Sequence, residues 1–348
     1  MRAAVLYDVD DVRVEERPIP EIGDGELLVR TMASGICSGD VMPWYIRRKA
    51  PLVLGHEPAG IVAQVCGNSS FAVGDRVFVH HHAPCFECAV CRRGAHVQCA
   101  TWRASKIEPG AIAEYFRVPV ENQRDTLRVP AGVSFPDAAL TEPLACVVKS
   151  LRRSRAAAGD AVYVVGLGVM GQLHVLAARH LGCEVFASDF IEARRAIAAR
   201  NGAVAFPPEA FRSALGAGAA VVICGPGTTR AMEHAFEAVA ASGTVVMFTP
   251  FPPDVPLTIG ADRFYFGDLT AVASYSAGPD DTRAALDLIE RGVVTAEKVG
   301  ATLVAIEDVP RVYRELAEAR IVKPIVSFSP TSQEPWLAAR TKRGSLPA

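Results

Sequence analysis

The chain has 348 residues, of which 50% are hydrophobic and 21% are charged, and its formal net charge is −2 at pH 7. This length is more than one core usually fills, so two domains are expected. The nearly neutral charge argues against nucleic-acid binding, which usually needs a basic face or stripe. No run reaches the roughly 18 apolar residues of a membrane span, so no membrane partner is expected.

The N-terminus also argues against secretion, because the segment from Met1 to Asp8 reaches an acid too soon for the apolar region of a signal peptide. The nine cysteines would indicate disulfides only in a short secreted protein. The sequence therefore predicts a cytoplasmic protein.

Residues 1–150 have the pattern of an irregular β-rich domain. Short alternating runs, such as 27–30 and 75–79, are broken by Gly, Pro and Asp. From about residue 159 the pattern changes, and apolar runs alternate with Ala-rich helical stretches such as 192–200. The runs are 161–165, 183–187, 219–223, 244–248 and 269–273. This alternation over 151–278 predicts an α/β domain with a parallel sheet covered by helices on both faces.

The C-terminal part is expected to hold two helices, near 280–291 and 308–319, and a late strand within 321–328. The segment 331–348 mixes Pro, Gly, Ser and charge, and is expected to form a loosely held tail.

The segment 166–171 (GLGVMG) matches the G-x-G-x-x-G pattern of dinucleotide-binding turns. It follows the apolar run 161–165 directly and opens a helical stretch at 172–181, which is the context that the pattern requires. Its glycines permit a tight turn and close approach of backbone N–H groups to a pyrophosphate. The candidate cofactor-binding residues are Gly166, Gly168, Val169, Met170, Gly171, Asp189 and Arg194.

Asp189 ends the next predicted strand, twenty-three residues after the first glycine. An acid here accepts hydrogen bonds from ribose hydroxyls and repels a 2′-phosphate, which favours NAD over NADP. The alternative is a chance Gly-rich turn in which Asp189 caps a helix.

Four cysteines form a compact group within the segment 80–100: Cys85, Cys88, Cys91 and Cys99. A closed shell of four thiolates is what a structural zinc requires. Iron–sulfur clusters also use four thiolates, but with other spacings. The preceding His80, His81 and His82 have no obvious partner in the sequence and are expected to be exposed polar residues rather than ligands.

A second metal site is suggested by Cys37, Asp40, His56, Glu57 and Glu142. A catalytic zinc needs about three protein ligands and an open position. Each of these residues alone would indicate little, because a single His or Cys is more often packed structure.

Taken together, the motifs resemble those of the zinc-dependent medium-chain dehydrogenases of the alcohol, sorbitol and threonine dehydrogenase type, from residue 1 to about 328. The resemblance is carried by Gly35-Ile36-Cys37 with Asp40, Gly55-His56-Glu57 to Gly60, Val73-Gly74-Asp75-Arg76-Val77, the four cysteines, Ala113-Glu114-Tyr115, Glu142-Pro143-Leu144 and the glycine turn.

The resemblance implies a GroES-like β-rich catalytic domain built from residues 1–150 and 279–330, around an inserted Rossmann domain at 151–278. It also implies a catalytic zinc held by Cys37, His56 and Glu142, with Glu57 able to move onto the metal in polyol-type enzymes. Asp40 would be the carboxylate that orients His56.

Three positions depart from the family pattern. Gly39 stands where the family usually has a Ser or Thr that passes the substrate proton outward, and Ser38 is displaced by one. Met42 replaces a histidine that many members carry. Ser274 stands where sorbitol dehydrogenases place an arginine before the tyrosine that matches Tyr275, so the substrate is not expected to be simply sorbitol.

Trp44, Tyr45 and Tyr275 are candidates for the substrate wall. The adjacent basic triplet 47–49 has two interpretations, a grip for a phosphate or carboxylate and a solvated loop, of which the second is favoured.

The resulting expectation is an enzyme that transfers hydride between a small-molecule secondary alcohol (polyol, cyclitol or sugar-derived) and NAD, with two zinc ions per chain, as a homodimer or homotetramer. Two alternatives stay open: a non-catalytic NAD-binding regulator that keeps only the structural zinc, and a zinc-free quinone or enoyl reductase of the same fold.

Overall fold

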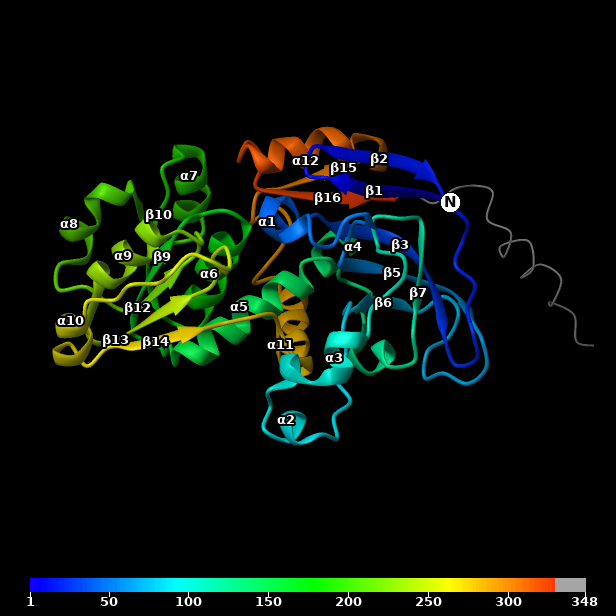
Figure 1. Ribbon diagram of the computed structural model, residues 1–348, viewed down its shortest axis with the longest axis horizontal. Coiled ribbons are helices and arrows are strands. Elements are labelled where there is room, and N and C mark those ends of the chain that lie inside the picture. The colour runs from blue at the N-terminus through cyan, green and yellow to red at the C-terminus, as the bar shows by residue number, and fades with distance from the viewer. Residues whose placement is uncertain (329–348) are drawn as a thin grey trace, which may run out of the picture.

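The computed structural model describes residues 1–328, and the predicted tail at 331–348 lies outside the described residues. Its strands form three sheets. The α/β architecture with one parallel sheet and a separate β-rich part confirms the predicted fold class (Figure 1). In the described part, no helix combines the length and the apolarity that crossing a membrane requires.

The six-stranded sheet is parallel throughout, with the order β11-β10-β9-β12-β13-β14. Its strands are β9 (Ala161–Val165), β10 (Glu184–Ser188), β11 (Val204–Phe206), β12 (Ala219–Cys224), β13 (Val239–Met247) and β14 (Thr270–Ala273). Its helices are α6 (Val169–His180), α7 (Glu192–Arg200), α8 (Phe211–Leu215), α9 (Thr229–Ala238) and α10 (Ala261–Phe266). The strand order reverses between β9 and β12, which creates a crevice at their carboxyl ends.

The seven-stranded sheet has the order β15-β16-β3-β5-β6-β8, and β7 also pairs with β3. Its strands are β3 (Leu27–Gly35), β5 (Glu57–Val65), β6 (Arg76–Val79), β7 (Tyr115–Val118), β8 (Thr126–Arg128), β15 (Ala301–Val304) and β16 (Lys323–Ser327). The last strand of the described chain therefore pairs with the third, and both ends of the chain build this β-rich part. The exact domain boundaries stay a prediction.

A three-stranded sheet, β2-β1-β4, covers one side of the β-rich part. It consists of β1 (Arg2–Asp8), β2 (Asp11–Glu16) and β4 (Leu52–Val53). Short helices connect the strands: α1 (Pro43–Ile46), α2 (Ala89–Arg92), α3 (Ala100–Ala104), α4 (Phe135–Ala138) and α12 (Val309–Ala317).

Two long helices, α5 (Thr141–Ser154) and α11 (Pro279–Glu290), lie between the two large sheets (Figure 1). They pack against each other, and α5 also contacts β5 on one side and β13 and β14 on the other. The largest core cluster runs continuously from the β-rich part through these helices into the parallel sheet, with Ala33, Leu144, Ala285 and Val164 among its buried members. The N-terminus of α5 is thereby fixed at the junction of the two parts.

In the turn after β9, the third glycine is required because a side chain at that position would not fit. A Cβ on Gly171 would collide with the carbonyl oxygen of Gly166, whereas a Cβ on Gly168 would meet no atom within 4 Å. Gly168 precedes α6, so the first N–H groups of this helix point toward the crevice. The turn therefore has the close helix–strand packing that the sequence pattern predicts.

Candidate functional site

The structure brings Cys37 and His56 together through strand pairing. Cys37 lies two residues beyond the end of β3, and His56 lies directly before β5. The two strands are antiparallel, and Gly35 pairs with Glu57. The end of one strand therefore meets the start of the other, and ligand atoms of Cys37, His56 and Glu57 lie within 4.8 Å of one another.

His56 lies beside a buried acid, Asp40, which the family resemblance predicts to orient the ring. Its Nδ1 lies 3.5 Å from Oδ2 of Asp40, which follows Cys37 in a short 3-10 helix (Ser38–Val41). Burial opposes protonation of His56, but the negative charges of Asp40 and Cys37 outweigh it and hold the pKa of His56 well above its usual value. Asp40 and Cys37 thus favour positive charge at this position, as a cation site requires.

Glu57 is committed to a partner that the sequence analysis did not consider. Its carboxylate forms a fully buried ion pair with Lys323 of β16, whose Nζ also donates to the carbonyl oxygen of Ile36 at 3.1 Å. Gly35 leaves room for this pair, since a Cβ at that position would collide with the Glu57 carboxylate. The ion pair neutralises Glu57 and ties both ends of the chain to the site. In the sequence, this ion pair was indicated by a lysine within the otherwise apolar segment 321–326.

Glu142 lies in the first turn of α5, where the chain crosses from the β-rich part to the parallel sheet. It is buried, and it forms no ion pair among residues 1–328. Burial raises the pKa of its carboxyl, while the positive charge of nearby His56 lowers it. The thiol of Cys146, one turn later, lies 3.7 Å from Oε1. Within the described residues, Glu142 is thus a buried acid that is not ion-paired.

The expectation that His80, His81 and His82 are exposed is wrong. His80 is fully buried, and its Nδ1 lies 2.6 Å from Oδ2 of Asp125. His81 and His82 are half-buried, and the His81 ring lies 5.0 Å from the His56 ring. The physical reason is that β6 ends in three buried residues, so the segment that follows continues inward. The apolar residues at the end of β6 were the feature of the sequence that indicated this burial.

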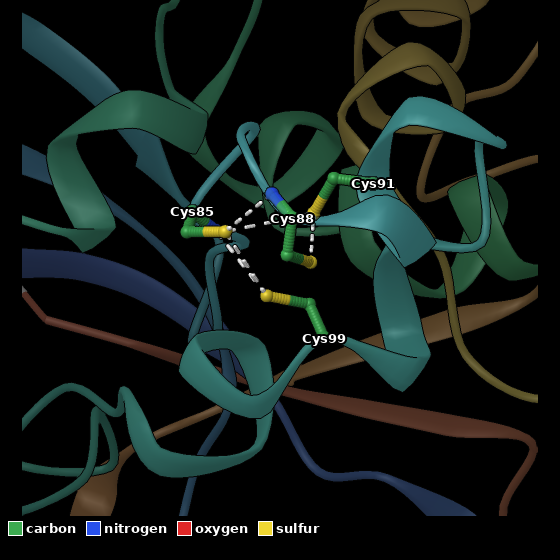
Figure 2. Close-up of side chains that lie close together, drawn as sticks. All are labelled: Cys85, Cys88, Cys91 and Cys99. Carbon is green, nitrogen blue, oxygen red and sulfur yellow. Dashed lines mark hydrogen bonds between the residues drawn. The ribbon is translucent and has the colours of Figure 1, made fainter.

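The four cysteines form a compact group at the tip of the α2 lobe (Figure 2). All four are free thiols. The Sγ atoms of Cys85 and Cys99 lie 3.6 Å apart, those of Cys88 and Cys91 3.5 Å, and those of Cys85 and Cys91 3.9 Å. Tetrahedral zinc with bonds of about 2.3 Å places sulfur atoms about 3.8 Å apart. The residues therefore fit a structural zinc, and the N–H groups of Glu87 and Cys88 lower the pKa of Cys85.

The crevice at the carboxyl ends of β9, β10 and β12 is a pocket of about 560 Å³. Gly166, Asp189 and Arg194 line it, together with Arg230 and His234. The Asp189 carboxylate accepts the N–H of Leu167 at 2.7 Å and that of Ile191 at 2.8 Å. Asp189 therefore fixes the glycine turn and faces the pocket. Val169 and Met170 form the first turn of α6 beside it.

The candidate substrate residues lie around the opening of the site. Trp44 and Tyr45 are half-buried on α1, and Tyr275 is exposed. The Tyr275 ring contacts Trp102, whose ring lies 4.3 Å from that of His82. The triplet 47–49 is exposed, as expected for a solvated loop.

Two of those basic residues lie over rings of the proposed substrate wall, Arg48 over Trp44 and Lys49 over Tyr45. Lys49 donates to the hydroxyl of Tyr45 at 2.6 Å and lies over its ring. Ser38 is exposed and Gly39 carries no hydroxyl, so the usual proton relay is missing at this position.

We expect Cys99→Ser to lower the melting temperature by several degrees and to remove one zinc per chain, because metal binding by such a group contributes folding free energy directly. Cys66→Ser, a half-buried cysteine outside the group, is the control and should change neither. Calorimetry and metal analysis measure both. Unchanged zinc content and melting temperature in Cys99→Ser would show that the lobe holds no metal.

Family models match two segments of the chain: the alcohol dehydrogenase GroES-like domain over residues 23–131 and the zinc-binding dehydrogenase over residues 169–291. D-xylulose reductase A of Aspergillus oryzae is 28% identical over 346 residues, which cover 93% of this chain and 95% of the relative. Sorbitol dehydrogenase of Bombyx mori is 32% identical over 211 residues, which cover 58% and 60%.

Solved structures agree over nearly the whole chain. A structure from Sinorhizobium meliloti bound to NADP, classed as a zinc-binding dehydrogenase, has a TM-score of 0.84 and 28% identity and covers 94% of this chain and 99% of its own. An alcohol dehydrogenase from Thermus sp. ATN1 also has a TM-score of 0.84, with 26% identity, covering 94% and 100%. With both family models matched in order along the chain, this chain belongs to the zinc-dependent medium-chain dehydrogenases.

Proposed function

We propose that this protein transfers hydride between a secondary alcohol (a polyol, cyclitol or sugar-derived alcohol) and NAD, at a zinc held by Cys37, His56 and Glu142. The observation that carries the proposal is the closeness of the Cys37 thiol and the His56 imidazole, whose ligand atoms lie within 4.8 Å. The buried acid Glu142 is near enough for the charge of His56 to lower the pKa of its carboxyl. The relatives that reduce xylulose or oxidise sorbitol support a sugar-derived alcohol as the substrate class.

Glu142 is a better third ligand than Glu57 on electrostatic grounds. A buried carboxylate without a counter-charge costs several kcal/mol, and a divalent cation would remove that cost for Glu142. Glu57 already has its counter-charge in Lys323. When bound, zinc supplies Lewis acidity that favours loss of the substrate's hydroxyl proton.

The remaining side chains orient the site and carry the proton. Asp40 holds the His56 ring through Nδ1, so that the other ring nitrogen is available to the metal. Because Gly39 lacks a hydroxyl, the proton leaves through a water hydrogen-bonded to the glutamate that does not ligate. In this assignment that glutamate is Glu57, which Lys323 keeps in place.

We expect Glu142→Gln and Cys37→Ser each to lower turnover by at least about 100-fold, since loss of even a residue that only orients a metal ligand costs about 10–100-fold. Affinity for NAD should be unchanged, because the glycine turn belongs to the parallel sheet and lies apart from the substituted residues. NADH absorbance with a panel of polyols, cyclitols, sugar phosphates, amino alcohols and hydrophobic secondary alcohols measures turnover, and fluorescence measures NAD binding.

Glu121→Gln, an exposed glutamate away from the site, is the matched control. Normal turnover in both site variants would show that the reaction does not occur here. Metal analysis separates the alternatives: two tightly held zinc ions per chain fit the enzyme, one fits a regulator, and none fits a zinc-free reductase.

NAD is proposed as the cofactor on the strength of Asp189, which lines the pocket and carries a negative charge where a 2′-phosphate would lie. We expect Asp189→Asn to raise the catalytic efficiency with NADP relative to NAD by about tenfold, since it removes the charge and keeps the acceptor oxygen for the Leu167 N–H. Arg194 lines the same pocket and would then be available to the phosphate. Equal use of both cofactors by the wild type would contradict the assignment.

We also infer a homodimer or homotetramer assembled through the β14 edge of the parallel sheet. β14 ends the sheet and is mostly exposed, and the preceding α10 presents Tyr265 and Phe266, which are 78% and 79% exposed. Large exposed aromatics beside an open edge indicate an interface. Light scattering should give a dimer or larger for the wild type and a smaller species for the double variant Tyr265→Ser/Phe266→Ser. A monomeric wild type would contradict this inference.

A further inference from the structure

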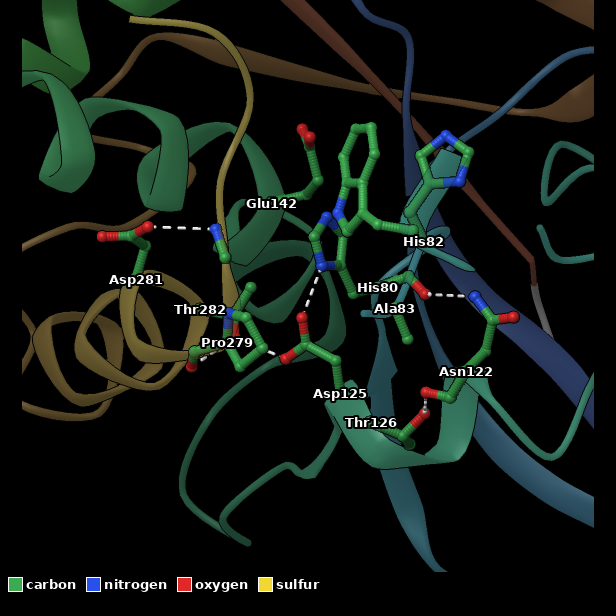
Figure 3. Close-up of polar contacts among 12 residues, drawn as sticks. His80, His82, Ala83, Asn122, Asp125, Thr126, Glu142, Pro279, Asp281 and Thr282 are labelled. Carbon is green, nitrogen blue, oxygen red and sulfur yellow. Dashed lines mark hydrogen bonds and ion pairs between the residues drawn. The ribbon is translucent and has the colours of Figure 1, made fainter. Parts of the chain in front are cut away.

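A second group of potential metal ligands lies directly beside the first. Ligand atoms of His80, His81 and Glu142 fall within 4.8 Å of one another, and His80 and Glu142 are buried. Figure 3 shows how His80 and Glu142 are arranged, with His80 bonded to Asp125 on its other side. We propose that these three side chains form a second divalent-cation position in the catalytic centre, next to the one at Cys37 and His56.

Two nitrogen atoms of this group are buried without a hydrogen-bond partner among residues 1–328: Nε2 of His80 and Nδ1 of His81. Buried polar atoms are nearly always satisfied, and leaving one unpaired costs free energy. Both atoms belong to side chains of the group that also contains Glu142. A shared cation would satisfy all three side chains at once.

His80 has the supporting contacts that metal-binding histidines usually have. Its Nδ1 is held by Asp125, and the other oxygen of Asp125 accepts the hydroxyl of Thr282 from α11 at 2.7 Å. Such a carboxylate fixes the ring orientation and leaves Nε2 for the metal. Asn122 also donates to the backbone oxygen of His80. The ring is therefore held in place before any ion binds.

Two imidazole nitrogens and one carboxylate oxygen suit a divalent transition-metal ion of the zinc class rather than calcium or magnesium. Bonds of about 2.1 Å require the three ligand atoms to approach by little more than an ångström. The His56 and His81 rings are 5.0 Å apart, so the proposed position lies beside the one at Cys37 and His56.

The test is a count of bound metal on the full-length protein, equilibrated with zinc and passed through a desalting column. We expect three zinc ions per chain for the wild type, two of which survive treatment with a chelating resin. His80→Gln and His81→Gln should each bind one ion fewer. His82→Gln is the matched control and should bind as many as the wild type, because its ring contacts the backbone of Ser105 instead.

Cobalt titration of the metal-free protein gives a second measurement that also covers the case in which His80→Gln fails to fold. His81 is only half-buried, so His81→Gln leaves the core intact. Cobalt at the cysteine-containing sites gives thiolate-to-metal charge-transfer bands, whereas cobalt held by two histidines and a glutamate gives only d–d bands. We expect a third equivalent with d–d bands alone, and its loss in His81→Gln.

A wild type that binds only two ions under saturating zinc would overturn this proposal, as would His80→Gln or His81→Gln binding as many ions as the wild type. Neither result bears on the proposed reaction at Cys37 and His56, which is tested separately by the turnover of Cys37→Ser. The two conclusions therefore fail separately.

Discussion

The site depends on one structural constraint, the antiparallel pairing of β3 with β5. Because Gly35 lies opposite Glu57, Cys37 and His56 are forced to the same end of the sheet, although they are 19 positions apart in the sequence. The pairing needs a residue without a side chain at 35, since the buried Glu57–Lys323 pair occupies that space. Lys323 comes from β16, which adds to β3 from the far end of the chain. The thiol, the imidazole and the ion pair are therefore consequences of one sheet.

Burial of charge is the second constraint. Asp40, Glu142 and Asp125 are all buried acids, and each is placed against a histidine or faces one. Burial raises the pKa of Asp40 and of Glu142, which means that the folded chain tolerates their negative charge only because positive charge is near. A region of this kind is poorly suited to a purely structural role, because apolar residues would fill it at lower cost.

The sequence predicted most of the fold because periodicity and turn residues act locally. The helix expected at 192–200 coincides with α7, and the strand expected at 161–165 coincides with β9. The last strand, β16, was also expected at roughly its observed place, within 321–328. Local patterns of this kind are read from neighbouring residues alone, and no long-range contact is needed.

The long-range partners could not be predicted in the same way. His80 was expected to be exposed, since its partner Asp125 lies 45 positions away and the sequence offers no signal that joins them. Lys323 and Glu57 are 266 positions apart, and neither spacing nor composition links them. Which carboxylate carries a counter-charge decides between Glu142 and Glu57 as a ligand, so that choice required the three-dimensional structure.

Of the three proposed ligands, Glu142 comes from a different part of the fold. Cys37 and His56 belong to one sheet, whereas Glu142 begins a helix that contacts both sheets and packs on α11. α11 in turn supplies Thr282, which holds the Asp125–His80 pair. The two helices between the sheets therefore connect the proposed metal ligands to the strands that form the candidate dinucleotide pocket. Any shift of one sheet relative to the other moves Glu142 with respect to Cys37 and His56, so the packing of α5 against α11 sets the geometry of the proposed reaction centre.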